Sequence, residues 1–280
     1  MKNLNKFGFN TSKLFYTIAE IGINHGGDLD KAKSLIDSAV RAEADSVKFQ
    51  TYLTEKRAPK DSPIFDILKQ CELPFDAFEK LKNHADEQSI EFFSTPFDEE
   101  SVQCLVDIDV NLYKVASFDV VNHKLLSSIA ETGKTIIMSV GMANTNEIKS
   151  AYKILKEKTE KITILHCVSA YPTEEKDANL AVINSLQKEF DCVIGQSDHT
   201  NDIKVPLYAA AMGAQILEKH YKINDEMDCI DAPVSITEKQ MLQFIEELNR
   251  LEKILGKPDI GLLDAEEGSK QFRRPSILNE

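Results

Sequence analysis

The sequence predicts an α/β protein built as a closed (β/α)8 barrel, the TIM-barrel fold. Apolar, β-branched stretches alternate with stretches of helical periodicity along the whole chain, and eight stretches of the first kind can be counted. Such alternation is typical of parallel strands joined by crossover helices. The length of 280 residues lies in the usual range for one barrel. An open, doubly wound sheet is the alternative, because a strand count from one sequence can be wrong by about one or two.

The predicted strands are short and are spread over the chain. In order they are Phe15–Ile21, Ser46–Gln50, Ile90–Ser94, Leu112–Val115, Thr135–Ser139, Ile162–Cys167, Cys192–Gly195 and Ile216–His220. The stretches between them repeat apolar residues at helical spacing. The first predicted helix begins after Asp28, which we expect to cap it, and the last carries Met241, Phe244 and Leu248 on one face.

No repeat, linker or low-complexity segment interrupts the alternation, so residues 1–280 are predicted to form a single barrel domain. Residues 1–14 precede the first strand, and we expect them to plug the bottom of the barrel. Residues 54–63 are polar, contain two prolines and are predicted to form a long loop over the top. Residues 256–280 form a tail with little periodicity, and the pattern assigns them no role.

The composition argues against several kinds of partner. A formal charge of −13 disfavours nucleic acid and anionic membranes. The longest weakly polar run, residues 207–217, is too short to span a bilayer, and the start of the chain lacks the apolar stretch of a secretory signal. The five cysteines are odd in number and show no CxxC spacing, which is typical of a reducing compartment. We therefore expect a cytoplasmic protein that acts on small molecules.

Polar side chains occur at or just after the C-terminal end of every predicted strand, which is where the active site of a barrel lies. They are Glu20, Lys48, Gln50, Ser94, Thr95, Lys114, Ser117, Ser139, His166, Ser197, Asp198, His199, Glu218 and His220. One such coincidence would mean little. Its repetition on all eight strands predicts an active site at this end of the barrel.

His199 and His220 lie at the ends of neighbouring predicted strands, so their imidazoles can meet in the barrel mouth. Two imidazoles completed by water or carboxylate oxygens suit Mn²⁺, Zn²⁺ or a similar ion. Structural roles are the alternative, because the spacing of the two histidines matches no short metal motif. Glu218 faces the same side of its strand as His220, which makes it a candidate third ligand or orienting group.

Lys48 and Lys114 each lie inside an apolar run, so both side chains are predicted to point into the barrel. A buried ammonium group needs an anion, and a substrate phosphate or carboxylate is the functional candidate. A buried ion pair with Glu20 or Asp231 is the structural alternative. Schiff-base formation is a third use, but it needs a lowered lysine pKa, which no sequence pattern indicates.

Other residues give weaker signals. Asp231 follows the last strand and is a candidate acid or base, although an aspartate in such a loop is more often a turn residue. His25 precedes two glycines and can cap the following helix, while His84 and His123 are expected on the surface. No GxGxxG, Walker or zinc-finger spacing is present, so nucleotide binding has no support.

Eight motifs run through the chain in a fixed order. They are IAEIGINHGG (18–27), VKFQTY (47–52), FSTPF (93–97), YKVAS (113–117), SVGM (139–142), HCVSAYPT (166–173), GQSDHT (195–200) and EKHY (218–221). This series resembles the sialic acid synthase family, which includes the N-acetylneuraminate, legionaminate and pseudaminate synthases. The resemblance implies a TIM barrel, in agreement with the alternation of the elements.

The resemblance also implies roles for particular residues. It implies a divalent metal held by His199 and His220, with Mn²⁺ expected and Mg²⁺ or Co²⁺ as alternatives. The residues that match phosphoenolpyruvate contacts are Lys48, Thr95, Lys114, Ser117, Ser139 and Ser197. Those that match positions near the sugar and the reacting carbons are Glu20, Gln50, Asp119, Ser169, Tyr171 and Asp231. Of these, Glu20 and Asp231 are the candidates for proton transfer.

The sequence departs from the family in several places. Asp119 stands where the family usually has Glu, Ser169 stands where sialate synthases often have Asn, and Phe118 is closer to the pseudaminate type. Loop 53–70 is shorter than in typical sialate synthases. The end of the chain, FRRPSILNE (272–280), corresponds to the start of the linker to an antifreeze-like domain, so we expect that domain to be absent. A truncated chain, a separate capping chain and an open site are the alternatives.

The activity implied by the resemblance is condensation of phosphoenolpyruvate with an N-acetylated amino-sugar aldehyde of the N-acetylmannosamine kind. The products would be a nine-carbon 2-keto sugar acid and phosphate. Family members are dimers, so a homodimer is expected. Two alternatives stay open: a Schiff-base barrel aldolase, and a capless, non-catalytic barrel that binds a sugar or regulates a partner protein.

Overall fold

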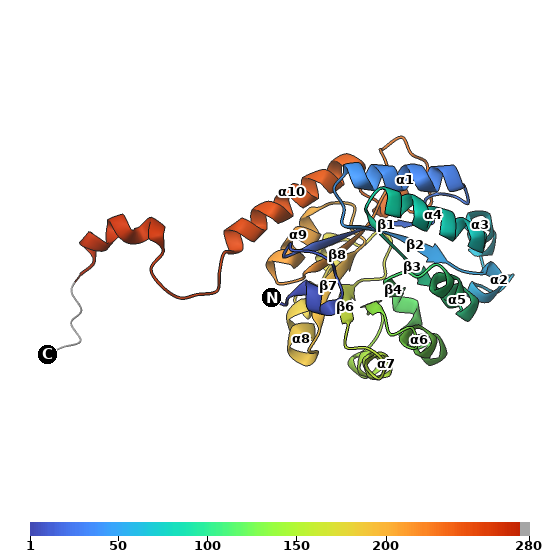
Figure 1. Cartoon of the computed structure of the whole chain (residues 1–280), viewed down its shortest axis with the longest axis horizontal. Coiled ribbons are helices and arrows are strands. Elements are labelled where there is room, and N and C mark those ends of the chain that lie inside the picture. The colour runs from blue at the N-terminus through green and yellow to red at the C-terminus, as the bar shows by residue number, and fades with distance from the viewer. Residues whose placement is uncertain (275–280) are drawn as a thin grey trace.

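The computed structural model describes residues 1–274 and shows a closed barrel of eight parallel strands surrounded by helices (Figure 1). The strands are β1 Tyr16–Gly22, β2 Ser46–Thr51, β3 Glu91–Pro96, β4 Leu112–Val115, β5 Thr135–Ser139, β6 Ile162–Cys167, β7 Val193–Asp198 and β8 Ile216–His220. Each strand pairs with the next along the chain, and β1 closes the barrel against β8. The predicted (β/α)8 barrel is confirmed and the open sheet is excluded. The largest difference at a strand end is in β7, which continues past its predicted end at Gly195.

The helices cover the outside of the barrel. They are α1 Leu29–Arg41, α2 Thr54–Arg57, α3 Phe65–Cys71, α4 Phe75–Glu87, α5 Glu99–Asp107, α6 His123–Ala130, α7 Thr145–Lys156, α8 Val182–Glu189, α9 Lys204–Ala211 and α10 Glu238–Leu255. Asp28 caps α1 as predicted, because its carboxylate accepts the backbone N–H groups of Asp30 and Lys31. The predicted cap role of His25 is wrong: its Nδ1 accepts the N–H of Gly27 inside the β1–α1 turn.

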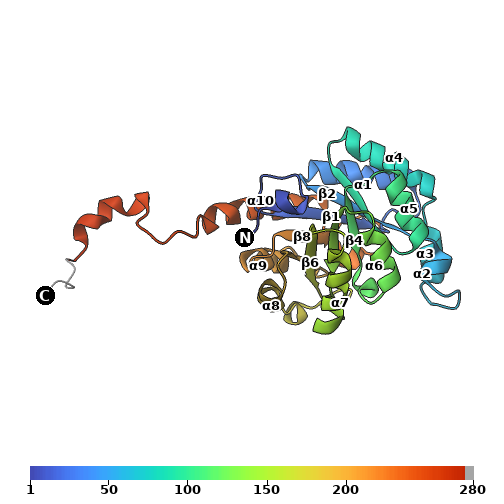
Figure 2. The same ribbon diagram turned by 60° about the horizontal axis from the view of Figure 1, so that its bottom comes forward.

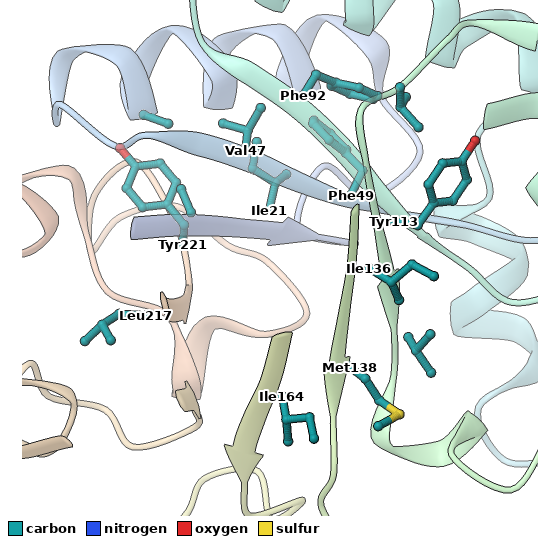
Figure 3. Close-up of a cluster of buried hydrophobic side chains, with 14 of the residues drawn as sticks. Ile21, Val47, Phe49, Phe92, Tyr113, Ile136, Met138, Ile164, Leu217 and Tyr221 are labelled. Atoms are coloured by element: carbon teal, nitrogen blue, oxygen red, sulfur yellow. The ribbon is translucent and has the colours of Figure 1, made fainter. Parts of the chain in front are cut away.

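The main apolar core lies between the strands and the helices. Figure 3 shows outward-facing strand side chains such as Ile21, Phe49 and Ile164 within this core. Successive residues of a strand point to opposite faces, so the neighbours of these residues point into the barrel. The barrel interior is therefore determined by every second strand residue.

A second, smaller core fills the lower half of the barrel interior, and we call it the apolar floor. Its buried residues are Leu4, Phe9, Tyr16, Ile18, Phe93, Leu112, Ile137, Leu165, Val193 and Ile216. Leu4 and Phe9 come from the segment before β1, which contains the short 3-10 helix η1 Leu4–Phe7, capped by Asn3. The N-terminal segment thus closes the bottom of the barrel, as predicted.

Two peripheral segments need comment. The prediction that residues 54–63 form only a loop is wrong at its start, because the N–H groups of Arg57 and Ala58 bond to the Leu53 and Thr54 carbonyls and form the single turn of α2. Residues 256–274 leave the barrel and carry the 3-10 helix η5 Asp264–Phe272 (Figures 1 and 2). The last part of the FRRPSILNE segment, 275–280, lies outside the described residues. Within residues 1–274, no helix has both the length and the apolar character that crossing a membrane requires.

Candidate active site

A pocket of about 340 Å³ opens at the C-terminal ends of the strands, and all eight strands contribute to its wall. The predicted site residues that line it are Glu20, Lys48, Gln50, Thr95, Lys114, Ser117, Ser139, Tyr171, Ser197, His199, His220 and Asp231. Twelve of the fourteen residues to which the family resemblance assigns a role thus line one pocket, as does Glu218, the candidate third metal ligand. Their assigned roles in binding and catalysis remain predictions.

The strand geometry explains why these side chains meet. Ile18, Leu112 and Ile216 belong to the apolar floor, and the residues two positions further along the same strands are Glu20, Lys114 and Glu218. A step of two residues keeps a side chain on the same face and moves it about 7 Å toward the C-terminal end. The charged side chains therefore form a layer directly above the floor. We call this the polar layer: Glu20, Lys48, Thr95, Lys114, Ser139, Ser197 and Glu218.

Two ammonium groups and two carboxylates of the polar layer form a buried charge network. Lys48 Nζ lies 2.9 Å from Glu20 Oε2 and 3.6 Å from Glu218 Oε2, while Lys114 Nζ lies 3.7 Å from Glu218 Oε1. Lys48 Nζ also donates to Thr95 Oγ1 (3.1 Å). The ion pair between Lys48 and Glu20, the structural alternative for this lysine, is therefore present.

The hydroxyl groups complete this network. Lys114 Nζ donates to Ser139 Oγ at 2.7 Å, and Ser197 Oγ donates to Glu218 Oε1 at 2.8 Å. Ser117 Oγ accepts the Gly141 N–H at 2.9 Å, which fixes its position at the end of β4. Glu218 thus contacts both lysines and a serine, and its role as a third metal ligand stays a prediction.

The two lysines differ in their electrostatic surroundings. Burial would lower the pKa of Lys48, but the Glu20 and Glu218 carboxylates hold it above its usual value. Burial lowers the pKa of Lys114, because the more distant Glu218 offsets that effect only in part. A bound anion would therefore stabilise the charged form of Lys114 more than that of Lys48.

The carboxylates also differ. Burial, reinforced by the neighbouring Glu218 carboxylate, raises the pKa of Glu20 even though Lys48 opposes the shift. For Glu218 burial is outweighed by Lys114 and Lys48, which lower its pKa to about 2. Burial is likewise outweighed at Asp231, where the two histidine rings and Arg57 keep the carboxyl pKa below its usual range. Glu20 is therefore easier to protonate than an ordinary carboxylate, although it pairs with Lys48 as a carboxylate, whereas Asp231 is held as a carboxylate.

His199 and His220 meet in the pocket as predicted, with ring centroids 5.3 Å apart. His199 Nδ1 donates to the Val168 carbonyl at 2.8 Å, which leaves Nε2 as its basic nitrogen. His220 Nδ1 lies 3.2 Å from Asp231 Oδ2, and this buried nitrogen forms no hydrogen bond in the described part of the chain. Tyr171 stacks on His199 with ring centroids 4.1 Å apart.

Cys167 is a pocket residue that the sequence reasoning did not select. Its Sγ lies 3.9 Å from His199 Nδ1. Burial would raise the pKa of this thiol, but His199, Ser117 and Lys114 lower it below its usual value. The position of Cys167 two residues beyond Leu165 of the floor is the signal that would have identified it as inward-facing.

Two predicted site residues lie outside the pocket wall. The Asp119 carboxylate accepts a hydrogen bond from Asn122 Nδ2 at 3.0 Å, within the turn after β4. Ser169 lines a neighbouring groove, with its Oγ 3.9 Å from Cys167 Sγ. Neither side chain lines the pocket in this structure, because both belong to loops whose direction no strand periodicity specifies, and their roles in sugar binding stay predictions.

Strand alternation also turns three other polar residues away from the pocket. His166 Nε2 lies 2.8 Å from the Ala178 carbonyl, and Asp198 pairs with the buried Lys219 at 2.7 Å. The hydroxyl of Ser94 lies 2.7 Å from that of Thr51. Each is one residue out of phase with an inward-facing neighbour, so its side chain lies on the outer face of the barrel.

The pocket has a further wall that the sequence did not reveal. It includes Arg57 and the apolar side chains Ile23, Ile64, Ile67, Leu68, Phe97, Phe118 and Ile230. Most of these residues lie in helices and loops above the strands, so no strand period places them. No group of three or more His, Cys, Asp or Glu side chains within residues 1–274 is arranged to hold a metal ion. A metal here would have the two histidines as its main protein ligands.

Comparison with known proteins gives consistent matches over most of the chain. A profile of the NeuB family matches residues 35–259. The N,N'-diacetyllegionaminic acid synthase of Campylobacter jejuni is 36% identical, over 85% of this chain and 77% of that protein. A pseudaminic acid synthase of the same species is 31% identical, over 95% and 81%. The crystal structure of an N-acetylneuraminic acid synthetase from Leptospira borgpetersenii is 38% identical with a TM-score of 0.90, covering 92% of this chain and 91% of that one.

Proposed function

Because the chain belongs to the NeuB family, we propose that it condenses phosphoenolpyruvate with an N-acetylated amino-sugar aldehyde in a metal-dependent reaction. The products are a nine-carbon 2-keto sugar acid and inorganic phosphate. The chain is thus a phosphoenolpyruvate-dependent synthase that forms a carbon–carbon bond, like the relatives named above. The observation that carries the proposal is the presence of two buried lysines and two histidines on one pocket at the barrel mouth.

The lysines are suited to phosphoenolpyruvate because they place two ammonium groups in a water-poor layer. Lys48 is already balanced by Glu20, whereas Lys114 has Ser139 as its close partner. An incoming phosphate or carboxylate gains charge-assisted hydrogen bonds from Lys114 and from the hydroxyls of Thr95, Ser117 and Ser197. We assign the anionic end of phosphoenolpyruvate to this part of the pocket.

The histidines fit a divalent ion. His199 Nδ1 donates a hydrogen bond to a backbone carbonyl, a contact that orients metal-binding imidazoles. His220 Nδ1 is buried without a hydrogen-bond partner among residues 1–274. Two imidazoles leave the remaining positions to water or substrate oxygens, which is typical of a catalytic site and not of a structural one. When bound, Mn²⁺ would polarise the aldehyde oxygen as a Lewis acid.

The carboxylates divide the proton transfers between them. Carbon 3 of phosphoenolpyruvate attacks the aldehyde carbon, and the resulting alkoxide takes up a proton. Water then adds to carbon 2, losing a proton, and the bond between carbon 2 and the phosphate oxygen breaks as the new carbon 2 hydroxyl gives its proton to the departing phosphate. Glu20, which burial disposes to hold a proton, is the candidate acid, and Asp231, held as a carboxylate beside His220, is the candidate base.

One observation favours the Schiff-base alternative, namely the lowered pKa of Lys114. The two mechanisms are separated by borohydride reduction in the presence of pyruvate. A Schiff-base aldolase would become covalently labelled at Lys114 and would keep its activity in a chelator. We expect no label and loss of activity on chelation.

The proposal is tested by incubating the protein with phosphoenolpyruvate, Mn²⁺ and a panel of N-acetylated hexoses while following phosphate release. We expect release that depends on one of the sugars, is abolished by EDTA and is restored by Mn²⁺. Reactions without sugar control for simple phosphatase activity. Absence of sugar-dependent release across the panel would refute the synthase assignment. A homodimer and a cytoplasmic location also remain predictions, and light scattering tests the first.

A further inference from the structure

Arg57 lines the pocket, yet the reaction described above gives it no role. It ends α2, and its guanidinium carbon lies 3.8 Å from the ring centroid of Phe97 and 4.5 Å from that of Tyr52. The two rings meet edge to face with centroids 6.3 Å apart. Stacking on aromatic faces holds a planar guanidinium in a fixed orientation. Arg57 is therefore a positioned group and not a mobile surface cation.

The hydrogen bonds of Arg57 leave most of its donors free. Nη1 donates to Gln50 Oε1 at 2.9 Å, and Gln50 Nε2 donates in turn to Glu20 Oε1 at 3.3 Å. No carboxylate oxygen within residues 1–274 forms an ion pair with the guanidinium at 4.0 Å or less. A guanidinium has five N–H donors, and Arg57 is partly buried, so donors on its buried side are unfavourable without acceptors. The pocket therefore offers N–H groups that a ligand oxygen can satisfy.

The surroundings of Arg57 indicate what kind of oxygen this is. The pocket that Arg57 lines also contains Asp231, a carboxylate, and the lysines of the polar layer are already balanced by Glu20 and Glu218. That balance disfavours a dianionic phosphate and permits a neutral oxygen acceptor. The neighbouring wall from α3 is apolar, with Ile64, Ile67 and Leu68 lining the pocket.

One hydrogen bond connects this apolar wall to Tyr52, the ring on which Arg57 stacks. Tyr52 Oη donates to the Leu68 carbonyl at 2.9 Å, so the ring that carries Arg57 also positions α3. A ligand group that fits both features has an oxygen acceptor next to a small apolar part. The acyl substituent of an amino sugar has this combination.

We propose that Arg57 is a specificity-determining residue that donates a hydrogen bond to the carbonyl oxygen of the sugar's acylamino group. The methyl of that acyl group packs against the apolar side chains of α3. This inference rests on the proposed function and extends it by assigning the group that recognises the acyl substituent. A site with buried donors rejects a substrate that lacks the matching acceptor, because the donors are then left unpaired.

The test compares N-acetylmannosamine with mannose, which has a hydroxyl in place of the acetamido group, in the wild type and in Arg57→Met. We expect the variant to lose about tenfold or more in kcat/KM for N-acetylmannosamine, since a missing buried hydrogen bond costs at least this much discrimination. Its activity with mannose and its KM for phosphoenolpyruvate should change less than threefold. Lys60→Met, which removes an exposed cation from the same segment, is the matched control and should behave as wild type.

Other outcomes overturn the inference. Equal losses of kcat/KM with both sugars would mean that Arg57 has a structural role. In that case thermal unfolding should show a lowered midpoint for both Arg57→Met and Arg57→Lys. A selective loss with N-acetylmannosamine 6-phosphate alone would assign Arg57 to a phosphate. If no sugar is turned over, the proposed function fails. The inference about Arg57 is then tested by saturation-transfer NMR, which measures binding of N-acetylmannosamine to the phosphoenolpyruvate-loaded protein. Binding to wild type but not to Arg57→Met supports the inference, and no binding to wild type refutes it.

Discussion

The apolar floor and the polar layer of the barrel are built from the same strands but from opposite kinds of side chain. In the floor, residues such as Phe93 and Ile137 are fully buried and belong to one apolar cluster. Two residues further along the same strands, Thr95 and Ser139 hold the lysine side chains. The floor can therefore gain free energy from burial alone, whereas the polar layer must satisfy each charge with a partner.

The apolar floor therefore mainly stabilises the fold, whereas the polar layer mainly supplies the groups for binding and catalysis. A floor side chain contributes free energy of unfolding in proportion to the apolar surface that it buries. A buried charge pair contributes little net stability, but loss of one partner is costly because the other charge stays buried. Substitutions in the two layers should therefore have different signatures, and the predictions below follow from that contrast.

The largest effect is expected above the polar layer, at the histidines. We expect His199→Ala or His220→Ala to reduce kcat by about 1,000-fold or more, which corresponds to about 4 kcal/mol of transition-state stabilisation. Excess Mn²⁺ should not restore the rate, and the thermal midpoint should change little. Retention of more than about a tenth of the wild-type rate would refute the metal role, since loss of a ligand is worth several kcal/mol.

Within the polar layer the two lysines should respond differently. Lys48→Met leaves Glu20 and Glu218 facing each other without their shared cation, so it should lower the free energy of unfolding by about 3–5 kcal/mol as well as raising the KM for phosphoenolpyruvate. Lys114→Met should raise the same KM with a smaller loss of stability, because its carboxylate partner is more distant. Urea unfolding and steady-state kinetics measure both quantities. Equal stability losses would contradict the asymmetry.

In the floor the signature should be reversed. Phe93→Ala should lower the free energy of unfolding by about 3–5 kcal/mol, because it leaves a large cavity among rigid neighbours. The kcat of the folded fraction should stay within about threefold of wild type, since the polar layer does not depend on this ring for a hydrogen bond. A large fall in kcat without loss of stability would show that the floor also positions the site.

A pH effect is expected at His25, in the turn at the top of β1. Burial lowers the pKa of His25 to about 4, so the folded protein holds the ring neutral. Below pH 6.5 the unfolded chain takes up a proton that the folded chain does not, and stability falls between about pH 6.5 and pH 4 by on the order of 3 kcal/mol. His25→Gln should flatten the stability profile in this window. An unchanged profile would contradict the assignment.

The smallest effect is expected at Ser169, which the sequence placed in the site and the structure places in the neighbouring groove. Ser169→Ala should change kcat/KM for either substrate by less than about twofold, as surface-loop substitutions usually do. Ser139→Ala is the matched comparison, because Ser139 accepts a hydrogen bond from Lys114 in the polar layer. Comparable losses of kcat/KM in both variants would show that Ser169 takes part in substrate binding.

The residues that sequence reasoning placed correctly are mostly those controlled by strand periodicity. Lys48 and Lys114 could be selected because each is a charged residue inside an apolar run. An apolar run of that length predicts a strand, and the C-terminal ends of barrel strands all lie at one mouth. His166 lies at a strand end like His199, but it is one residue out of phase and faces outward. Phase is decided by strand boundaries, which sequence patterns give least well.

Residues on loops could not be placed in this way. Arg57 lies in a segment that was expected to be only a loop, and its position depends on contacts with Phe97 and Tyr52 that no short-range pattern encodes. Asp119 was expected to hold the sugar, but a hydrogen bond from Asn122 directs its carboxylate into its own turn. The sequence therefore predicts the polar layer well and the outer wall of the pocket poorly.

The central claim is that one pocket holds a divalent ion on the two histidines beside phosphoenolpyruvate on the two lysines. The most direct measurement is an anomalous difference map from crystals soaked with Mn²⁺ and phosphoenolpyruvate. We predict one strong peak in contact with ring nitrogens of both His199 and His220, with the ligand's anionic groups on Lys48 and Lys114. A manganese peak elsewhere, or phosphoenolpyruvate bound away from the polar layer, would contradict the account.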